Sequence, residues 1–419
     1  MLSALDHLRR IYVEGAGGYR PPVPHRARAL ERAARRAMSK DAWGYLFGGA
    51  GLGATIDANR RDFDRWRIRP RMLEDVSGFD LSAEFFGAPV AAPIFLSPMG
   101  VMGLAHRDAD LAVAEGAAAL DLPVVISNQA SHPMERIVER LGDTPHAFQL
   151  YWSREEALVR SLVRRAEACG ARAIVLTLDT KMLGWRPYDL DRAFLPFLAA
   201  QGIAQYTSDP EFNRLLAEAV DDPDAPKPRL GPGTAKTLAT MLRTHPGRVR
   251  DNLRTQAPIR AARLFTAIYS NPALGRDHIR RLREMTTLPI AIKGVLHPED
   301  AGWAAEEGIA VYVSNHGGRQ VDGAISAIAA LPDVVEAVGG RVPVLFDSGV
   351  RGGADVAKAL ALGADAVGIG RPWGYGLAVA GAKGVEEVMR GIASETELTL
   401  RLCGLTQARN VPRDLLVEA

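Results

Sequence analysis

The sequence predicts a single (β/α)8 barrel, an α/β fold, with an N-terminal helical segment and a long insertion between the fourth and fifth strands. Three observations support this prediction. From residue 93 onward, short apolar runs alternate with amphipathic stretches of helical length. Polar and charged residues stand where the apolar runs end, and the last two runs are followed by glycine-rich loops that carry arginine. A doubly wound open sheet is the alternative, but one uninterrupted series of such units favours a closed barrel.

Each predicted strand is short, apolar and followed by a helical pattern. The strands are expected at residues 93–97, 123–127, 147–152, 173–179, 289–295, 310–314, 343–347 and 366–370. The stretches 154–169 and 351–362 are examples of the helices between them. Continuous apolar strands separated by helices indicate a parallel sheet that is covered on its outer face.

We divide the chain into an N-terminal helical lead-in (1–92), a barrel (93–404) and a C-terminal tail (405–419). In the lead-in, glycines and prolines predict a loose or wrapping segment over residues 1–25. A helix is expected over 26–47, with Tyr45 near its end, and a second over 55–63, with Thr55 as its N-cap.

The insertion covers residues 181–275, where a barrel needs only a short loop and one helix. Its first part is rich in proline, and residues 234–272 have a helical, arginine-rich pattern. A long insertion on this face of a barrel is usually a lid or a partner-binding element. A disordered linker is the alternative for residues 221–233.

Composition argues against several classes of partner. The net charge of +2 over 419 residues gives no reason to expect binding to nucleic acid or to an anionic membrane surface. No apolar run is long enough to span a membrane, and no secretory signal is recognisable, so we expect a cytoplasmic protein. The only cysteines, Cys169 and Cys403, lack metal-ligand spacing and are expected to be reduced structural thiols.

The most informative stretch follows the sixth predicted strand. There an apolar run ends in Ser314, Asn315, His316, two glycines and Arg319. An imidazole that titrates near neutrality thus lies close to a permanent cation. This pairing suits a substrate with both a removable proton and a carboxylate, although a glycine-rich turn with an incidental histidine is the alternative.

The other strand ends supply further polar groups to the same predicted rim. In chain order these are Pro98, Met99, Gly100, Ser127, Asn128, Gln129, Gln149, Tyr151, Thr177, Asp179, Arg186 and Lys293. Polar residues also gather at loop starts in any barrel, but this set combines amide, hydroxyl, carboxylate, ammonium and guanidinium groups.

The loops after strands seven and eight predict a phosphate site. They contain Asp347, Gly349, Arg351, Gly370 and Arg371. Glycine-freed backbone N–H groups, a helix N-terminus and a guanidinium together bind phosphate, and barrels often do so at these two loops. Tight turns alone are the alternative explanation of the glycines. Because no dinucleotide fingerprint and no metal-ligand spacing occur, a flavin mononucleotide without a metal is the expected occupant.

These motifs resemble those of the FMN-dependent α-hydroxy acid oxidases and dehydrogenases. The resemblance runs from about residue 43 to residue 404 and includes Ser-Asn-His-Gly-Gly-Arg-Gln, Phe-Gln-Leu-Tyr, Leu-Thr-Leu-Asp-Thr and Asp-Ser-Gly-Val-Arg. Within the family, the nearest resemblance is to the lactate 2-monooxygenases, through Gly-Trp-Arg-Pro at 184–187, the segment 191–210 and the long insertion.

The resemblance implies a role for each matching residue. His316 is the base, Asp179 orients it, Arg319, Arg186 and Tyr45 hold the substrate carboxylate, and Tyr151 bonds to the hydroxyl. The residues implied to contact FMN are Pro98, Met99, Gly100, Ser127, Gln149, Thr177, Lys293, Ser314, Asp347, Gly349, Arg351, Gly370 and Arg371. Lys293 places a positive charge beside the flavin ring, and Arg351, Gly370 and Arg371 lie at the phosphate.

The family also implies a small 2-hydroxy acid as substrate, molecular oxygen as acceptor and a homo-oligomer, commonly a tetramer or octamer. Gly100, Gln129 and Trp185 depart from residues common in relatives, and Gly100 accompanies coupled decarboxylation in the monooxygenase-like branch. An oxidase or dehydrogenase of a larger, peptide-derived or secondary-metabolite substrate is therefore one alternative. Alternatives of another class are a phosphate-binding barrel isomerase and a non-catalytic flavin-binding barrel.

Overall fold

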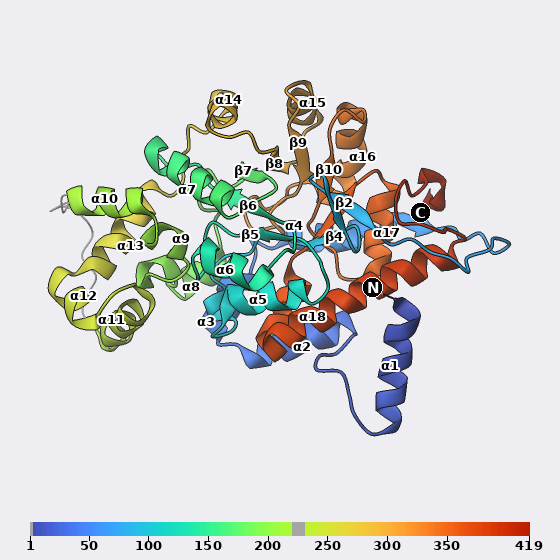
Figure 1. The fold of residues 1–419 in the computed structure, drawn as a ribbon, viewed down its shortest axis with the longest axis horizontal. Helices are drawn as coiled ribbons and strands as arrows, with labels where there is room; N and C mark the ends of the chain where they lie inside the picture. Colours follow the sequence, from blue (N-terminus) through green and yellow to red (C-terminus); the bar gives the residue numbers. More distant parts are fainter. Residues whose placement is uncertain (1–2, 220–230) are drawn as a thin grey trace.

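A closed barrel of eight parallel strands forms the centre of the protein, which confirms the predicted fold class (Figure 1). The computed structural model describes residues 3–219 and 231–419. The barrel strands are β4 (Ile94–Leu96), β5 (Val124–Ile126), β6 (His146–Leu150), β7 (Ile174–Thr177), β8 (Ile290–Val295), β9 (Ala310–Val313), β10 (Val344–Phe346) and β11 (Ala366–Ile369). β11 pairs with β4 and closes the ring. Each strand lies within a run predicted from the sequence or differs from it by a residue at one end.

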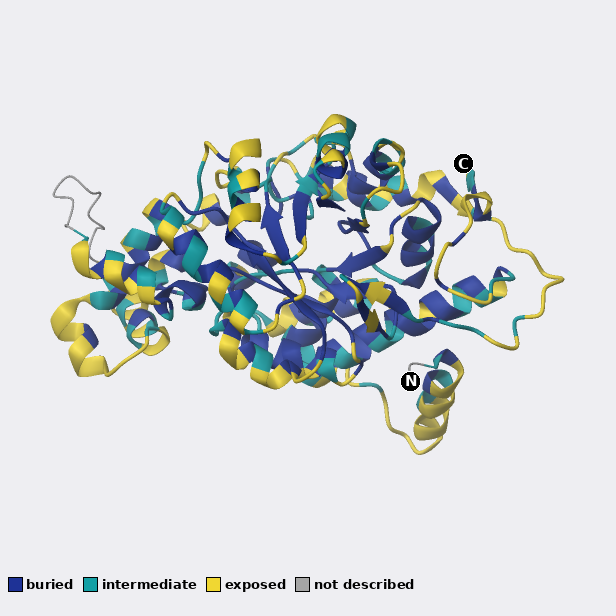
Figure 2. Cartoon of the chain, turned by 45° about the horizontal axis from the view of Figure 1, so that its top comes forward, coloured by how far each residue is buried: buried dark blue, intermediate teal, exposed yellow. Residues whose placement is uncertain are grey.

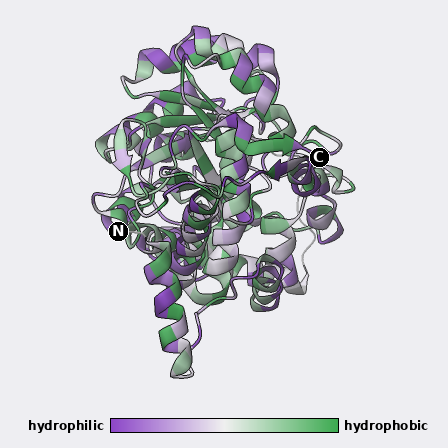
Figure 3. Cartoon of the chain, turned by 90° about the vertical axis from the view of Figure 1, so that its right-hand side faces the viewer, coloured by the Kyte–Doolittle hydropathy of each residue, from purple (hydrophilic) through white to green (hydrophobic). Residues whose placement is uncertain are grey.

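Amphipathic helices cover the outside of this barrel. They are α5 (Ala109–Ala118), α6 (Met134–Leu141), α7 (Glu156–Ala168), α14 (Arg276–Met285), α15 (Pro298–Glu306), α16 (Ala327–Val338), α17 (Gly353–Ala361) and α18 (Arg371–Leu402). α7 shows why they form: Leu158, Val159, Leu162, Val163 and Ala166 fall on one face and are buried. The barrel strands are buried except at Gly294 of β8, whereas the outer helices carry exposed residues and alternate between polar and apolar bands (Figures 2 and 3).

The N-terminal region differs from the prediction in three respects. It contains α1 (Ala4–Ala16), α2 (Ala27–Ala37), α3 (Lys40–Phe47), α4 (Ala54–Arg61) and the 3-10 helix η1 (Asp62–Arg65). The prediction of a loose segment over 1–25 was wrong for α1, which begins at an N-cap in which Ser3 accepts the Asp6 N–H. The helix expected over 26–47 is broken at Met38 and Ser39, because Ser39 caps α3. The predicted N-cap Thr55 lies inside α4, whose N-cap is Gly53.

α1 is the helix that was hardest to predict from the sequence. Only Ala4 and His7 of this helix are buried, so no apolar stripe marks it. It projects from the rest of the molecule and contacts it mainly through α18 (Figures 1 and 2).

The insertion is a compact helical structure on one side of the barrel (Figure 1). It contains α8 (Pro187–Asp191), the 3-10 helix η3 (Pro196–Ala199), α9 (Ala204–Thr207), α10 (Pro210–Glu218), α11 (Pro232–Thr244), α12 (Val249–Thr255) and α13 (Ala257–Ile268). Several prolines stand in the first helical positions, where the missing N–H costs nothing. Phe197, Tyr206, Phe212 and Phe265 are completely or almost completely buried and form its own aromatic core. Most of the alternative linker over 221–233 lies outside the described residues, but α11 begins at Pro232.

Short strands complete the molecule at both ends of the chain. β2 (Ala83–Phe85) and β3 (Ala88–Val90) form a hairpin that packs Phe85 and Val90 against the interior residue Phe95 of the barrel. β1 (Trp66–Ile68) pairs with β12 (Leu416–Glu418), which follows the 3-10 helix η4 (Arg413–Leu415). A further 3-10 helix, η2 (Met102–Leu104), follows β4. None of the helices in the described part of the chain is both long and apolar enough to cross a membrane.

Candidate active site

A cavity opens at the carboxyl ends of the barrel strands. Its volume is about 980 Å³, including its opening to solvent. Fifteen of the predicted site residues line it: Tyr45, Pro98, Met99, Gly100, Gln149, Tyr151, Arg186, Lys293, His316, Arg319, Asp347, Gly349, Arg351, Gly370 and Arg371. Apart from Tyr45 and Leu46 of α3, its lining residues come from the ends of all eight barrel strands or from the segments that follow them.

Four predicted residues, Ser127, Thr177, Asp179 and Ser314, do not line the cavity but lie directly behind residues that do. Gln149 connects two of them, because it accepts a hydrogen bond from Ser127 at 3.2 Å and donates one to Thr177 at 3.1 Å. The Lys293 ammonium donates to Ser314 at 2.7 Å. These buried hydroxyls therefore fix the orientation of an amide and a cation that face the cavity.

Asp179 and His316 form the central pair of the site. The His316 Nδ1 lies 2.8 Å from the Asp179 Oδ1. A carboxylate only accepts, so Nδ1 carries the proton and Nε2 keeps its lone pair. Gly294 makes room for this carboxylate, since a Cβ at that residue would lie 2.8 Å from Asp179 and its φ is +102°. His316 itself has a φ of 56°, a left-handed conformation that places a bulky residue under strain, as often occurs at functional sites.

The two members of this pair titrate in opposite senses. Burial alone would raise the pKa of Asp179, but the charge and hydrogen bond of His316 lower it from 3.8 to about 2. Burial lowers the pKa of His316 below its ordinary value, and this outweighs the raising effect of Asp179. At neutral pH the pair is therefore a carboxylate beside a neutral imidazole that can accept a proton.

Two tyrosines remain protonated donors beside this base. Burial raises the pKa of Tyr45 to about 12. Burial, together with the negative charge of Asp179, also raises the pKa of Tyr151. Tyr151 accepts a hydrogen bond from Gln149 at 3.3 Å, so its own O–H stays available to a ligand.

Arg186 and Arg319 bring two guanidinium groups to the same end of the cavity. Their hydrogen bonds go to neutral oxygens, including Arg319 to the Gly48 carbonyl at 2.8 Å and Arg186 to the Gln320 amide at 2.7 Å. Burial, and then the charge of Arg186, lower the pKa of Arg319 to about 9. The charge of the Asp189 carboxylate acts on both groups, but no ion pair joins a carboxylate to either guanidinium in the described part of the chain, so this end of the cavity can accept an anion.

Arg351 and Arg371 form a second cationic end. Arg371 begins α18, and its N-cap Gly370 also lines the cavity. At the start of α17, by contrast, the N–H of Gly353 already donates to the Glu395 carboxylate. Burial lowers the pKa of Arg371 to about 10, and the Arg371 side chain donates to the Gly317 carbonyl at 2.8 Å. Gly317 must be glycine here, because a Cβ would lie 2.6 Å from that guanidinium and φ is +64°. This donor set is chemically suited to a phosphate such as that of FMN.

Asp347 and Lys293 connect the two ends. The Asp347 carboxylate accepts hydrogen bonds from Tyr312 at 2.9 Å and from Ser314 at 2.5 Å. Lys293 lies 3.6 Å from the same carboxylate. Ser97 is bonded to the Tyr312 hydroxyl at 3.0 Å and completes a fully buried network beneath the cavity. This network of fixed charges and hydroxyl groups suits the ring and hydroxyl chain of a flavin.

Sequence reasoning missed several lining residues. They are Leu46, Ser97, Thr180, Leu183, Phe197, Tyr269, Gly317, Ser348 and Val350. Phe197 and Tyr269 come from the insertion, where no motif marks them, and only the fold places them over the barrel mouth. Thr180 was identifiable, because it follows Asp179 directly and donates to that carboxylate at 2.9 Å.

Gln129 also lies on the cavity wall, beside Gly100. A Cβ added at Gly100 would lie 2.8 Å from the Gln129 Cβ and 3.3 Å from the Ser127 hydroxyl. Gly100 and Gln129, two of the residues that differ from those common in relatives, are therefore neighbours in the cavity wall.

Comparison with known proteins gives a consistent result. The model of the family described as FMN-dependent dehydrogenase matches residues 34–418. An L-lactate oxidase of Lysinibacillus sphaericus is 37% identical, and the similarity covers 95% of this chain and 94% of the relative. An FMN-dependent alpha-hydroxy acid dehydrogenase of Penicillium citrinum is 36% identical, over 97% and 94% of the two chains. The solved structure of mandelate oxidase with (S)-4-hydroxymandelic acid has a TM-score of 0.76, 32% identity, and coverage of 93% of this chain and 98% of its own.

Proposed function

The chain belongs to the FMN-dependent dehydrogenase family, and on that premise we propose that it oxidises a lactate-like L-2-hydroxy acid to the 2-keto acid and passes the electrons to molecular oxygen. The observation that carries this proposal is the pairing of a neutral His316 base with two guanidinium groups, that of the buried Arg186 and that of the partly buried Arg319. A 2-hydroxy acid presents the matching groups, a carboxylate and an adjacent carbon that carries a hydroxyl.

In this proposal the substrate carboxylate lies against Arg319 and Arg186, with Tyr45 as a further donor. Two hydrogen-bonding cations at one end fix the acid in a single orientation. The Nε2 of His316 then accepts a proton from the substrate, and Asp179 stabilises the imidazolium that results. Tyr151, held protonated by its environment, bonds to the substrate oxygen.

FMN, when bound, supplies the oxidising power, because its ring accepts two electrons from the substrate. This chain would hold it through Arg351 and Arg371 at the phosphate, Asp347 at the hydroxyl chain, and Lys293 and Gln149 at the ring. The fixed charge of Lys293 favours a ring that has gained negative charge.

The reaction can end in three ways, as an oxidase, a monooxygenase or a dehydrogenase, which differ in the electron acceptor and in the product. We include coupled oxidative decarboxylation, in the manner of lactate 2-monooxygenase, because Gly100 lines the cavity without a side chain. Its neighbour on the cavity wall is Gln129. Product analysis after aerobic turnover of L-lactate separates the outcomes: acetate and carbon dioxide support decarboxylation, whereas pyruvate and hydrogen peroxide indicate a simple oxidase. Turnover with an artificial electron acceptor but not with oxygen would instead indicate a dehydrogenase.

A larger hydroxy acid is the second candidate substrate. Four apolar side chains in the segment after β7 are exposed: Met182, Leu183, Trp185 and Tyr188. Leu183 also lines the cavity, so this apolar surface adjoins its mouth. We expect the ratio of kcat/KM for L-mandelate to kcat/KM for L-lactate to decide between the two: a ratio well above one favours the larger substrate.

The insertion contributes Arg186, Phe197 and Tyr269 to the cavity, which supports its proposed role as a lid. The homo-oligomer and the cytoplasmic location stay predictions. Light scattering of the purified protein and localisation of the tagged protein in its native cell test them.

A further inference from the structure

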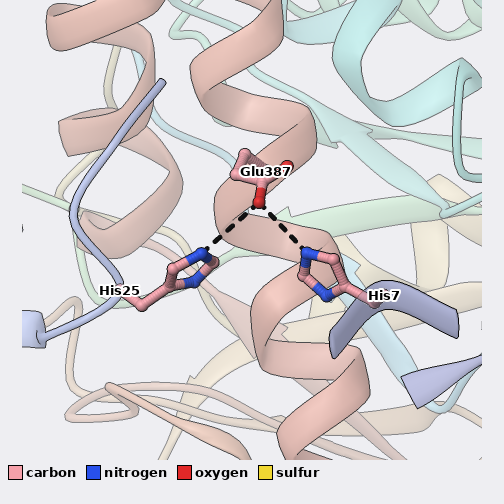
Figure 4. Close-up of side chains that lie close together, drawn as sticks. All are labelled: His7, His25 and Glu387. Carbon is pink, nitrogen blue, oxygen red and sulfur yellow. Dashed lines mark hydrogen bonds and ion pairs between the residues drawn. The ribbon is translucent and has the colours of Figure 1, made fainter. Parts of the chain in front are cut away.

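A second cluster of titratable side chains lies outside the active site. It consists of His7 in α1, His25 in the segment between α1 and α2, and Glu387 in α18 (Figure 4). One ligand atom from each residue lies within 4.8 Å of the others. These residues are distant in sequence, and only the fold brings them together.

The distances within the cluster match those of a tetrahedral metal site. The Glu387 Oε1 lies 3.0 Å from the His7 Nε2 and 3.4 Å from the His25 Nε2. Zinc holds nitrogen and oxygen ligands at about 2.0 to 2.1 Å in tetrahedral geometry, which separates neighbouring ligand atoms by roughly 3.3 Å. The two distances that involve Glu387 are thus within a few tenths of an ångström of this separation, and the two imidazole nitrogens lie within 4.8 Å of each other.

Neighbouring groups orient the proposed ligands, as outer partners do in metal sites. The His7 Nδ1 lies 2.9 Å from the Ser394 hydroxyl, which leaves Nε2 to face Glu387. Arg10 donates to the Glu387 Oε2 at 2.9 Å, so the other carboxylate oxygen remains directed toward the two imidazoles.

Gly391 provides the space for His25. A Cβ at this residue would lie 3.2 Å from the His25 Nδ1, which is closer than most side chains tolerate. The His25 side chain is 40% exposed, whereas those of His7 and Glu387 are at most 6% exposed. One ligand thus remains accessible from solvent and gives an ion a path into an otherwise buried site.

The cluster occupies the place where α1 is attached to the body of the protein. Ala4 and His7 are the only buried residues of this helix, so an imidazole stands where an apolar anchor is usual. We propose that His7, His25 and Glu387 bind one divalent transition-metal ion, best fitted by zinc, with water as the fourth ligand, and that this ion fixes α1 to α18. Two nitrogen ligands favour zinc over magnesium or calcium, which prefer all-oxygen sites.

Metal binding to the tag-free, FMN-loaded protein tests this proposal. After treatment with a chelator, the protein is dialysed against zinc and its metal content is measured by elemental analysis. We expect about one zinc per chain at neutral pH, and weaker binding at acid pH because protonated imidazoles cannot ligate.

Two variants identify the ligands. We expect His25→Gln to weaken zinc binding by at least roughly 10- to 100-fold. Loss of a residue that only hydrogen-bonds to a metal ligand already lowers metal affinity by that factor. His297→Gln is the matched control, because His297 is an exposed histidine at the start of α15 and its loss should leave zinc binding unchanged. His25 is partly exposed, so the variant should keep its flavin spectrum and activity, which verifies folding.

Proteolysis tests independently whether zinc fixes α1 to α18. Zinc should slow trypsin cleavage after the exposed residue Arg26, which follows His25 directly, in the unmodified protein but not in His25→Gln. Absence of stoichiometric zinc from the unmodified protein, or equal zinc binding by His25→Gln, would overturn the proposal.

Discussion

Replacing Asp179 by asparagine tests the role of the carboxylate that contacts His316. The substitution keeps the size of the side chain and removes its charge. Asp179 has a pKa lowered from 3.8 to about 2, mainly through its charge interaction and hydrogen bond with His316. This difference corresponds to about 2 to 3 kcal/mol. The same interaction stabilises the imidazolium formed when His316 accepts a proton, so its loss should slow flavin reduction roughly 30- to 150-fold.

The pH dependence gives the prediction a second signature. His316 must be neutral to act as a base, so kcat/KM should fall as the pH drops through its lowered pKa. Asp179 raises that pKa, and removing its charge should therefore move the acid limb to still lower pH while the maximal rate decreases.

The assay is anaerobic stopped-flow measurement of flavin bleaching over a range of pH, at saturating L-lactate for the maximal rate and at subsaturating L-lactate for the acid limb of the free enzyme. Asp322→Asn is the matched control, because Asp322 lies in the loop after β9 that also carries His316 but accepts hydrogen bonds from Leu52 and Thr55 instead of contacting His316. It should reduce flavin at the unmodified rate. A decrease below threefold in Asp179→Asn, with an unmoved acid limb, would refute the reasoning.

Four further substitutions test other parts of the site. His316→Gln should retain FMN but slow flavin reduction roughly 10²- to 10⁴-fold, and rapid bleaching would contradict its role as base. Arg371→Met should raise the Kd for FMN about 10- to 150-fold in fluorescence titrations, since a charge-assisted hydrogen bond is worth about 1.5 to 3 kcal/mol; unchanged affinity would place the phosphate elsewhere. Arg319→Lys should raise KM about 10-fold with flavin content unchanged, because an ammonium cannot reproduce the planar fork, and an unaltered KM would remove the carboxylate from this residue. Gly100→Ala should lower the free energy of unfolding by about 1 to 3 kcal/mol in denaturant titrations, because its Cβ would lie 2.8 Å from that of Gln129; a variant as stable as the parent would show that Gln129 moves freely.

The barrel was predictable because its signal is local and repeated. Strands such as β9 and β10 are continuous apolar runs that end in polar residues, and each is followed by a helix whose apolar residues are buried. For the same reason the site residues at strand ends could be identified before the structure, because a parallel barrel brings all these ends to one rim. The phosphate loops carried their own glycine and arginine signal.

Features that depend on contacts distant in sequence could not be predicted. Phe197 and Tyr269 reach the cavity only because the insertion folds around its own aromatic core. α1 escaped detection because it buries one alanine and one histidine instead of an apolar stripe. The cluster of His7 with Glu387 shows no ligand spacing in the sequence, because these two residues are 380 positions apart.

A crystal structure of the FMN-loaded protein with a bound 2-keto acid tests the central claim most directly. The account predicts the FMN phosphate on Arg351 and Arg371, the acid carboxylate on Arg319, and the His316 Nε2 within about 2.6 to 3.2 Å of the keto oxygen. A phosphate bound elsewhere, or an imidazole of His316 turned away from the acid, would contradict it.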